Sequence, residues 1–164
     1  EAHFIVLNTG VYDRTAAVDE MILEAQREWL QKDLEANKDA DWTVLMIHQP
    51  VYDRKGGDAS RPWLSDLIEG YGVDLVLQGH VHQVSRTYPI KDGKVVSRNI
   101  TDTIEKGIGT VYTTVGATTT NHDGLSAGVQ DNYYLTFTPE TPQPTYTTVT
   151  VQEGYCEASK RSCC

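Results

Sequence analysis

Residues 73–82 of the chain read VDLVLQGHVH, an apolar stretch that runs directly into a glycine and two histidines. Val73 to Leu77 is typical of a buried β-strand. Gly79 follows the strand, and because glycine has no Cβ it allows a sharp turn and a close approach to a ligand. The sequence therefore predicts a strand that delivers His80 and His82 to one edge of a sheet.

The segment before this strand predicts a helix and another strand. Trp42 to Ile47 is a second buried strand, and it ends at His48-Gln49-Pro50, where the proline disfavours further pairing. Ser60 and Pro62 mark a helix start, and apolar residues follow at helical spacing. Strand, helix and strand in this order form a right-handed crossover in a parallel sheet, so both strands end at the same edge.

The flanking segments extend this pattern to an α/β fold. Phe4 to Leu7 is a continuous apolar run, the pattern of a strand covered on both faces, and periodic apolar residues predict a helix over Ala16–Ala36. Beyond Val84 the helical signal disappears, and residues 91–94 predict a hairpin turn. We expect a βαβαβ unit followed by mainly antiparallel strands over 110–115, 133–138 and 146–151, all within one domain of residues 1–152.

The composition limits the classes of partner. The chain has 164 residues, with 14 Lys plus Arg against 23 Asp plus Glu, and a net charge of −9. Because its basic residues are scattered, such an acidic chain repels a nucleic-acid backbone, and we expect no nucleic-acid binding. No stretch approaches the roughly 20 apolar residues that a membrane helix requires, so we expect no membrane span.

Residues 153–164 are predicted to form a tail that contains all three cysteines, Cys156, Cys163 and Cys164. Because three is an odd number, at least one thiol is unpaired within the chain or bonded elsewhere. A disulfide-bonded tail in an extracellular or cell-surface parent protein is one interpretation. An accident of where the chain ends is the other.

His48, His80 and His82 are the candidate metal ligands. Open α/β sheets bind ligands at the carboxyl ends of their strands, and imidazole binds transition metals such as zinc and iron well. A single histidine at a strand end is more often an ordinary hydrogen-bonded residue. Two neighbouring strands that both end on histidine, with a third histidine two residues later, favour a metal site.

Four segments carry a resemblance to a known family. They are WL at 29–30 with Leu34, VLMIHQPVY at 44–52, LQGHVHQVSRTYP at 77–89 and the strand over residues 109–116. In these segments the sequence resembles the calcineurin-like metallophosphoesterases, and it looks closest to their purple acid phosphatase-like branch. The resemblance implies the C-terminal half of an α/β/β/α sandwich.

The resemblance also implies a function, the metal-dependent hydrolysis of a phosphoester substrate at a pair of divalent or trivalent ions, Zn, Fe or Mn. Carried over to this sequence, His48 and His80 bind one ion and His82 binds its neighbour. Tyr52 and Arg86 lie near the implied pocket and are candidate substrate-binding residues, Arg86 through a bidentate contact to phosphate. A packing or solvated role is the alternative for each of these two residues.

Three motifs of the family, D-x-H, G-D-x-x-D and G-N-H-D/E, do not occur in this sequence. In the family they precede the segment that begins here at Phe4, and they supply the acidic and asparagine ligands. We therefore expect the isolated chain to be nearly inactive, with weak binding of a single ion at most. Because half a sandwich leaves Phe4 to Leu7 without cover, we also expect a homodimer through the exposed sheet edge.

Two other functions remain open from the sequence. One is a binding or structural module that keeps the half-fold without catalysis. The other is a hydrolase with one zinc ion held by three histidines, which would keep one coordination position for water.

Overall fold

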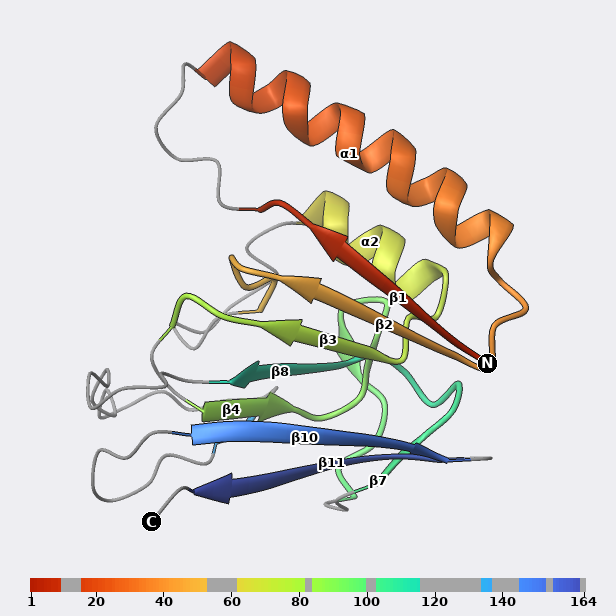
Figure 1. The fold of residues 1–164 in the computed structure, drawn as a ribbon, viewed down its shortest axis with the longest axis vertical. Coiled ribbons are helices and arrows are strands. Elements are labelled where there is room, and N and C mark those ends of the chain that lie inside the picture. The colour runs from red at the N-terminus through yellow and green to blue at the C-terminus, as the bar shows by residue number, and fades with distance from the viewer. Residues whose placement is uncertain are drawn as a thin grey trace.

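The computed structural model describes residues 1–9, 16–52, 62–81, 84–99, 103–115, 134–136, 145–152 and 155–162 (Figure 1). Its elements are, in chain order, β1 (Ala2–Leu7), α1 (Ala16–Ala36), β2 (Trp42–Ile47), α2 (Pro62–Gly70), β3 (Leu75–Gln78), β4 (Val84–Thr87), β5 (Ile90–Lys91), β6 (Lys94–Val95), β7 (Thr103–Glu105), β8 (Val111–Val115), β9 (Tyr134–Thr136), β10 (Thr145–Gln152) and β11 (Tyr155–Ser162). The described chain is a mixed α/β structure with a six-stranded sheet, a three-stranded sheet and a two-stranded hairpin.

The larger sheet has the strand order β1-β2-β3-β8-β4-β9. β1, β2, β3 and β8 pair in parallel, whereas β4 pairs antiparallel with both β8 and β9. The parallel strands therefore point their carboxyl ends at one common edge, as the arrowheads in Figure 1 show. The histidines are predicted to lie at this edge.

Both helices pack on the same face of this sheet. Leu30 and Leu34 of α1, and Leu64 and Ile68 of α2, belong to one buried cluster with inward-facing residues of the strands. The cluster residues that belong to this sheet are Ile5, Leu7, Leu45, Ile47, Val76 and Tyr112. Both crossovers, β1-α1-β2 and β2-α2-β3, are right-handed and step in the same direction across the sheet. Their helices therefore cover the same face.

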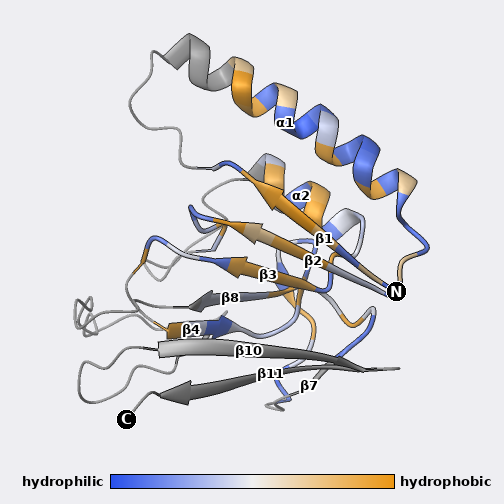
Figure 2. Ribbon diagram, in the orientation of Figure 1, coloured by the Kyte–Doolittle hydropathy of each residue, from blue (hydrophilic) through white to orange (hydrophobic). Residues whose placement is uncertain are grey.

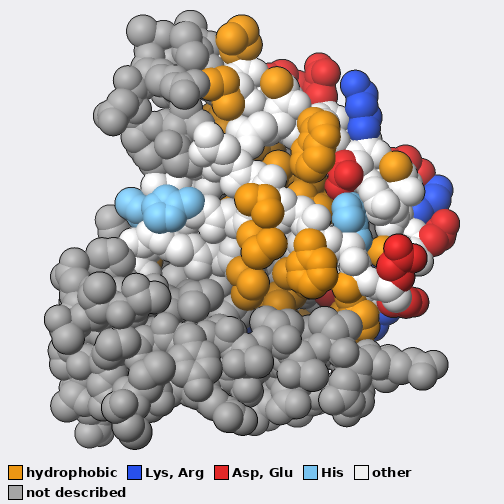
Figure 3. Space-filling model, viewed as in Figure 1, with side chains coloured by type: hydrophobic (Ala, Val, Ile, Leu, Met, Phe, Trp, Pro, Cys, Tyr) orange, Lys and Arg blue, Asp and Glu red, His pale blue; other side chains and the backbone are white. Residues whose placement is uncertain are grey.

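The opposite face is buried in its middle and open at β1. Trp42, Val44, Leu75 and Val111 form a second buried cluster there. Phe4 and Val6 alternate with the buried Ile5 and Leu7 and are 60% and 68% exposed. Figure 2 shows the apolar strands β1 to β3, and Figure 3 shows hydrophobic side chains gathered on the visible face over these strands. The expectation that β1 is covered on both faces is therefore wrong, since only its helix side is buried.

Several predicted elements are confirmed. The helix over Ala16–Ala36 and the strand over Trp42–Ile47 have the predicted bounds, and the strand before His80 is shifted to Leu75–Gln78. The hairpin turn at residues 91–94 forms, with Asp92 and Gly93 at φ 51° and 68°. β8 differs from the antiparallel pattern expected after residue 84, because it pairs in parallel with β3.

The C-terminal part of the chain differs most from expectation. Residues 155–162 form strand β11, which pairs antiparallel with β10 and β7 in a three-stranded sheet, so most of the predicted tail belongs to the fold. Cys156 lies opposite Val151 in this pairing. Cys163, Cys164 and the helix-start residue Ser60 lie outside the described residues. The disulfide state and the extracellular location remain predictions. In the described part of the chain, no helix combines the length and apolar character needed to cross a bilayer.

Candidate metal centre

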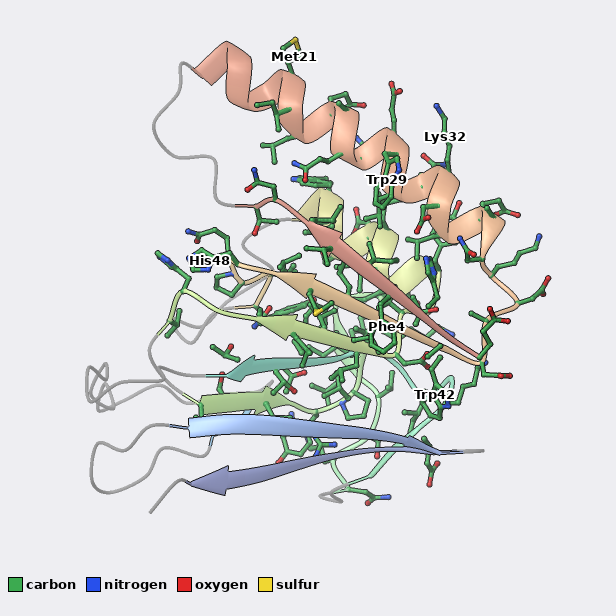
Figure 4. The ribbon with its side chains drawn as sticks, viewed as in Figure 1. Phe4, Met21, Trp29, Lys32, Trp42 and His48 are labelled. Carbon is green, nitrogen blue, oxygen red and sulfur yellow. The ribbon has the colours of Figure 1, made fainter. Side chains whose placement is uncertain are left out.

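His48 and His80 meet at the carboxyl edge of the parallel sheet. His48 directly follows β2, and His80 lies two residues after β3, the neighbouring strand. Their ring centres are 5.4 Å apart in an edge-to-face arrangement, with 76° between the ring planes. Both side chains are exposed, and Figure 3 shows histidine side chains at the surface of this edge, where Figure 4 labels His48.

The backbone holds these two strand ends together beyond the last ladder pair. The Gly79 N–H donates to the His48 carbonyl oxygen over 3.0 Å. A Cβ added at Gly79 would lie 3.4 Å from Nδ1 of His48, which is van der Waals contact. A Cβ would therefore fit at Gly79 beside the His48 ring, and the expected close approach of Gly79 to a ligand remains a prediction.

The sharp turn occurs at His80. His80 has a φ of 65°, and the Val81 N–H donates to the Gly79 carbonyl oxygen over 2.8 Å, which closes a γ-turn around His80. A left-handed φ is uncommon for a residue with a side chain, and such strain persists where the surrounding structure holds it. The prediction that glycine makes this turn is thus wrong, because Gly79 itself is not left-handed and the histidine adopts the strained conformation.

The spacing of the two rings suits a shared metal ion. With bonds of about 2.0–2.1 Å from nitrogen to zinc, two imidazoles in a tetrahedral site place their ring centres roughly 5 Å apart. The observed 5.4 Å matches this spacing. Within the described ranges, no group of three or more His, Cys, Asp or Glu side chains is placed to hold an ion. His82, the third predicted ligand, lies outside the described residues, so its role remains a prediction.

Tyr52, a candidate for substrate binding, lies in the interior. It is 3% exposed, and its hydroxyl donates to Oε1 of Glu69 over 2.9 Å. The Tyr112 hydroxyl donates to the same oxygen over 3.0 Å, and the Gly93 N–H donates to Oε2 over 2.8 Å. The structure thus gives Tyr52 a packing and hydrogen-bonding role, the alternative role from the sequence, and its contact with substrate remains a prediction.

Arg86, the other candidate for substrate binding, lies in β4. It pairs with Thr113 of β8 and Leu135 of β9, so its side chain is on the sheet face that carries Leu77. Arg86 is half-buried. Its role toward a phosphate remains a prediction.

Sequence reasoning missed two polar residues that fix the turn after His48. Thr9 accepts a hydrogen bond from the Gln49 N–H over 2.7 Å, and Gln78 contacts the backbone of Val51 and Tyr52. Both are buried, at 4% and 2% exposure. A signal was present, since a glutamine in an otherwise apolar strand end requires partners for its amide once it is buried.

Comparison with known proteins adds a family to this geometry. The family model for calcineurin-like phosphoesterases matches residues 3–84, half of the chain. Acid phosphatase type 7 of Danio rerio is 32% identical over 118 residues, which cover 57% of this chain and 27% of the relative. The human acid phosphatase type 7 is 33% identical over 113 residues, with 57% and 26% covered. The chain therefore spans about a quarter of the length of these relatives.

Two solved structures share the fold. The purple acid phosphatase PPD1 from yellow lupin (Lupinus luteus) seeds superposes with a TM-score of 0.67 and 18% identity, over 97% of this chain and 28% of that one. GAP50, described as the anchor in the inner membrane complex of Plasmodium, gives a TM-score of 0.55 and 18% identity over 93% and 46%. By its family model, its relatives and its fold, the chain belongs to the calcineurin-like phosphoesterase family, in the purple acid phosphatase-like branch.

Proposed function

We propose that this chain supplies histidine ligands to a two-metal centre that hydrolyses phosphoesters in a longer parent protein. The observation that carries the proposal is the pair of His48 and His80 rings, 5.4 Å apart at the carboxyl edge of two parallel strands. Family membership supports phosphoester chemistry at such a site. His48 and His80 would hold one ion, and His82 would hold the second.

The bound ions would polarise the phosphoryl group, generate a nucleophilic hydroxide and stabilise the attacking and leaving oxygens of an in-line displacement. This chain contributes the positions of the imidazoles. The hydrogen bond between Gly79 and His48 keeps the two strand ends together, and the γ-turn at His80 sets the direction of the chain at Val81. Imidazole ligands suit Zn, Fe and Mn alike.

We further propose that the 164-residue chain alone hydrolyses phosphoesters slowly or not at all. Its sequence contains neither D-x-H nor G-D-x-x-D nor G-N-H-D/E, so the acidic and asparagine ligands of the family are not encoded in it. Neutral imidazoles alone do not balance the charge of two divalent ions. A single weakly bound ion is the expected state of the isolated chain.

The test compares hydrolysis of p-nitrophenyl phosphate by this chain and by a longer polypeptide that also carries those three motifs, each with added Zn²⁺, Mn²⁺ or Fe²⁺. We expect turnover only from the longer polypeptide. There His80→Ala should reduce kcat/KM by more than the about 10- to 100-fold that loss of an outer-shell partner causes. His3→Gln is the matched control, because His3 lies in β1 against Asp33 of α1 and is not a proposed ligand. Turnover by the short chain contradicts its inactivity, and an inactive longer polypeptide contradicts the proposed hydrolysis.

A non-catalytic module is the second candidate function. Exposed Phe4 and Val6 on the open sheet face favour it, since exposed apolar surface often marks an interaction site. The fold also occurs in GAP50, which is described as an anchor. The expected homodimer through the edge of β1 remains a prediction. Two results together would favour the module. The longer polypeptide would show no metal-dependent turnover, and this chain would still bind a partner or a second copy of itself.

A further inference from the structure

The Gln78 side chain links the segment after His48 to β8, the strand on the far side of β3. It is the last residue of β3 and is 2% exposed. Its Oε1 accepts from the Val51 N–H over 3.1 Å, and its Nε2 donates to the Tyr52 carbonyl oxygen over 2.7 Å. Nε2 also donates to Oγ1 of Thr114 in β8 over 3.1 Å.

These contacts continue the sheet beyond its backbone ladder. The backbone pairing of β2 with β3 ends at Met46 and Leu77. Beyond this point the side-chain amide of Gln78 accepts from Val51 and donates to Tyr52, as a paired strand residue would do with its backbone. A buried amide whose donor and acceptor are both hydrogen-bonded fixes the geometry around it, because losing a hydrogen bond there costs the free energy of an unpaired buried polar group. The position of the chain from His48 to Tyr52 thus depends on residue 78.

The backbone of the same residue leads directly into the second histidine. Gly79 follows Gln78 and donates to the His48 carbonyl oxygen, and His80 then forms the strained γ-turn. On the other side, Thr9 accepts from the Gln49 N–H over 2.7 Å and holds the turn toward β1. These buried groups hold the backbone from which the exposed His48 and His80 side chains extend.

We propose that Gln78 is a positioning residue for the histidine pair, which holds the His48 segment at the distance from His80 that one metal ion requires. This proposal depends on the proposed function in one respect only, that a metal ion binds between the two histidines. The arrangement of the two rings is a property of the metal-free chain and is measurable without any ligand.

The first test uses Gln78→Met in the 164-residue chain, which keeps the length of the side chain and removes both its donor and its acceptor. Two readouts are taken: the nuclear Overhauser contact between the His48 and His80 ring protons in the metal-free chain, and the affinity for Co²⁺ alone. We expect the ring contact to be lost and the affinity to fall about 10- to 100-fold, the range for residues that orient a metal ligand. Gln78→Glu, which keeps the acceptor for the Val51 N–H and loses the donor to Tyr52, tests the same point if Gln78→Met does not fold.

Thr114→Val is the matched control. It removes one hydrogen-bond partner of Gln78 at the end of the amide that faces β8 and leaves both contacts to residues 51 and 52 intact. We expect the control to lower the melting temperature while the ring contact and the Co²⁺ affinity stay within about twofold of the unchanged chain. A purely structural Gln78 would instead change the melting temperature alone.

The outcomes separate this proposal from the proposed function. A folded Gln78 variant that keeps the ring contact and the Co²⁺ affinity overturns the positioning role. If His48→Ala and the unchanged chain bind Co²⁺ equally, the metal site is wrong, but the ring contact of the Gln78 variants still decides whether residue 78 positions the pair.

Discussion

The two faces of β1 differ sharply in solvent exposure, although both consist of apolar side chains from one continuous run. Ile5 and Leu7 are 2% and 5% exposed beneath the helices, whereas Phe4 and Val6, their neighbours in the chain, are 60% and 68% exposed. The same alternation in β2 gives buried residues on both sides, Leu45 and Val44 being 0% and 2% exposed. The position of a strand in the sheet, and not its own sequence, therefore decides whether its second face is covered.

The largest expected effect comes from truncating the two faces of β1 in parallel. Ile5→Ala removes a fully buried side chain from the cluster with both helices and should lower the free energy of unfolding by about 2–5 kcal/mol. In the dilute monomer, Phe4→Ala should lower it by less than about 1 kcal/mol, because most of the side chain is already in water there. Urea unfolding followed by circular dichroism measures both. Equal losses would mean that the Phe4 face is covered in solution.

The open face also predicts association. Replacing Phe4 and Val6 together with lysine places two charges on the edge strand β1, where lysine opposes pairing with another strand, and leaves the buried cluster under the helices unchanged. If the expected homodimer forms through this edge, light scattering should show the unchanged chain shifting from dimer to monomer on dilution and the double variant remaining monomeric. A monomer across the whole concentration range in the unchanged chain contradicts the homodimer.

The fold and the site were predictable to different depths from the sequence. Hydrophobic periodicity located α1 and β2 because these elements bury regular apolar patterns. β11, read as a tail, has the sequence YCEASKRS, with no apolar alternation, so its pairing with β10 depends on contacts distant in the chain. The pair of His48 and His80 followed from strand order, but the γ-turn at His80 did not, because its strain comes from tertiary contacts.

Adjacent residues of β8 allow a finer comparison of the two faces. Tyr112 lies on the helix side and donates to Glu69, whereas the hydroxyl of Thr113 is on the other side, buried, and has no hydrogen-bond partner within the described structure. Tyr112→Phe should cost about 1–2 kcal/mol, since Glu69 loses a donor in the interior. Thr113→Val should be neutral or stabilising, because it replaces an unpaired hydroxyl with a methyl group. Thermal unfolding of both variants checks the opposite signs, and a clear loss of stability in Thr113→Val would reveal a partner for that hydroxyl.

The smallest effect is expected at the amino edge of the sheet, where a carboxylate closes the buried region. Oδ2 of Asp74 accepts from the Thr43 N–H over 2.9 Å, and the residue is 4% exposed. Burial raises the pKa of Asp74 above its usual value, although the hydrogen bond from Thr43 and the charge of Lys106 oppose this. The folded chain therefore holds the Asp74 proton more tightly than the unfolded chain, so this group contributes stability at low pH that is lost as the pH rises from the usual pKa through the raised one.

Asp74→Asn removes this dependence and keeps an oxygen that can accept from Thr43. We expect the free energy of unfolding of the variant to change less than that of the unchanged chain between about pH 4 and about pH 7, the interval above the ordinary pKa of aspartate. Asp66→Asn, an exposed position on α2, is the control and should leave the slope unchanged. A slope for Asp74→Asn equal to that of the unchanged chain would mean that Asp74 reaches water at this edge. At this edge the face opposite the helices would then be more accessible to water than the face beneath them. Its middle would differ from the open part at β1 only in how much water reaches it.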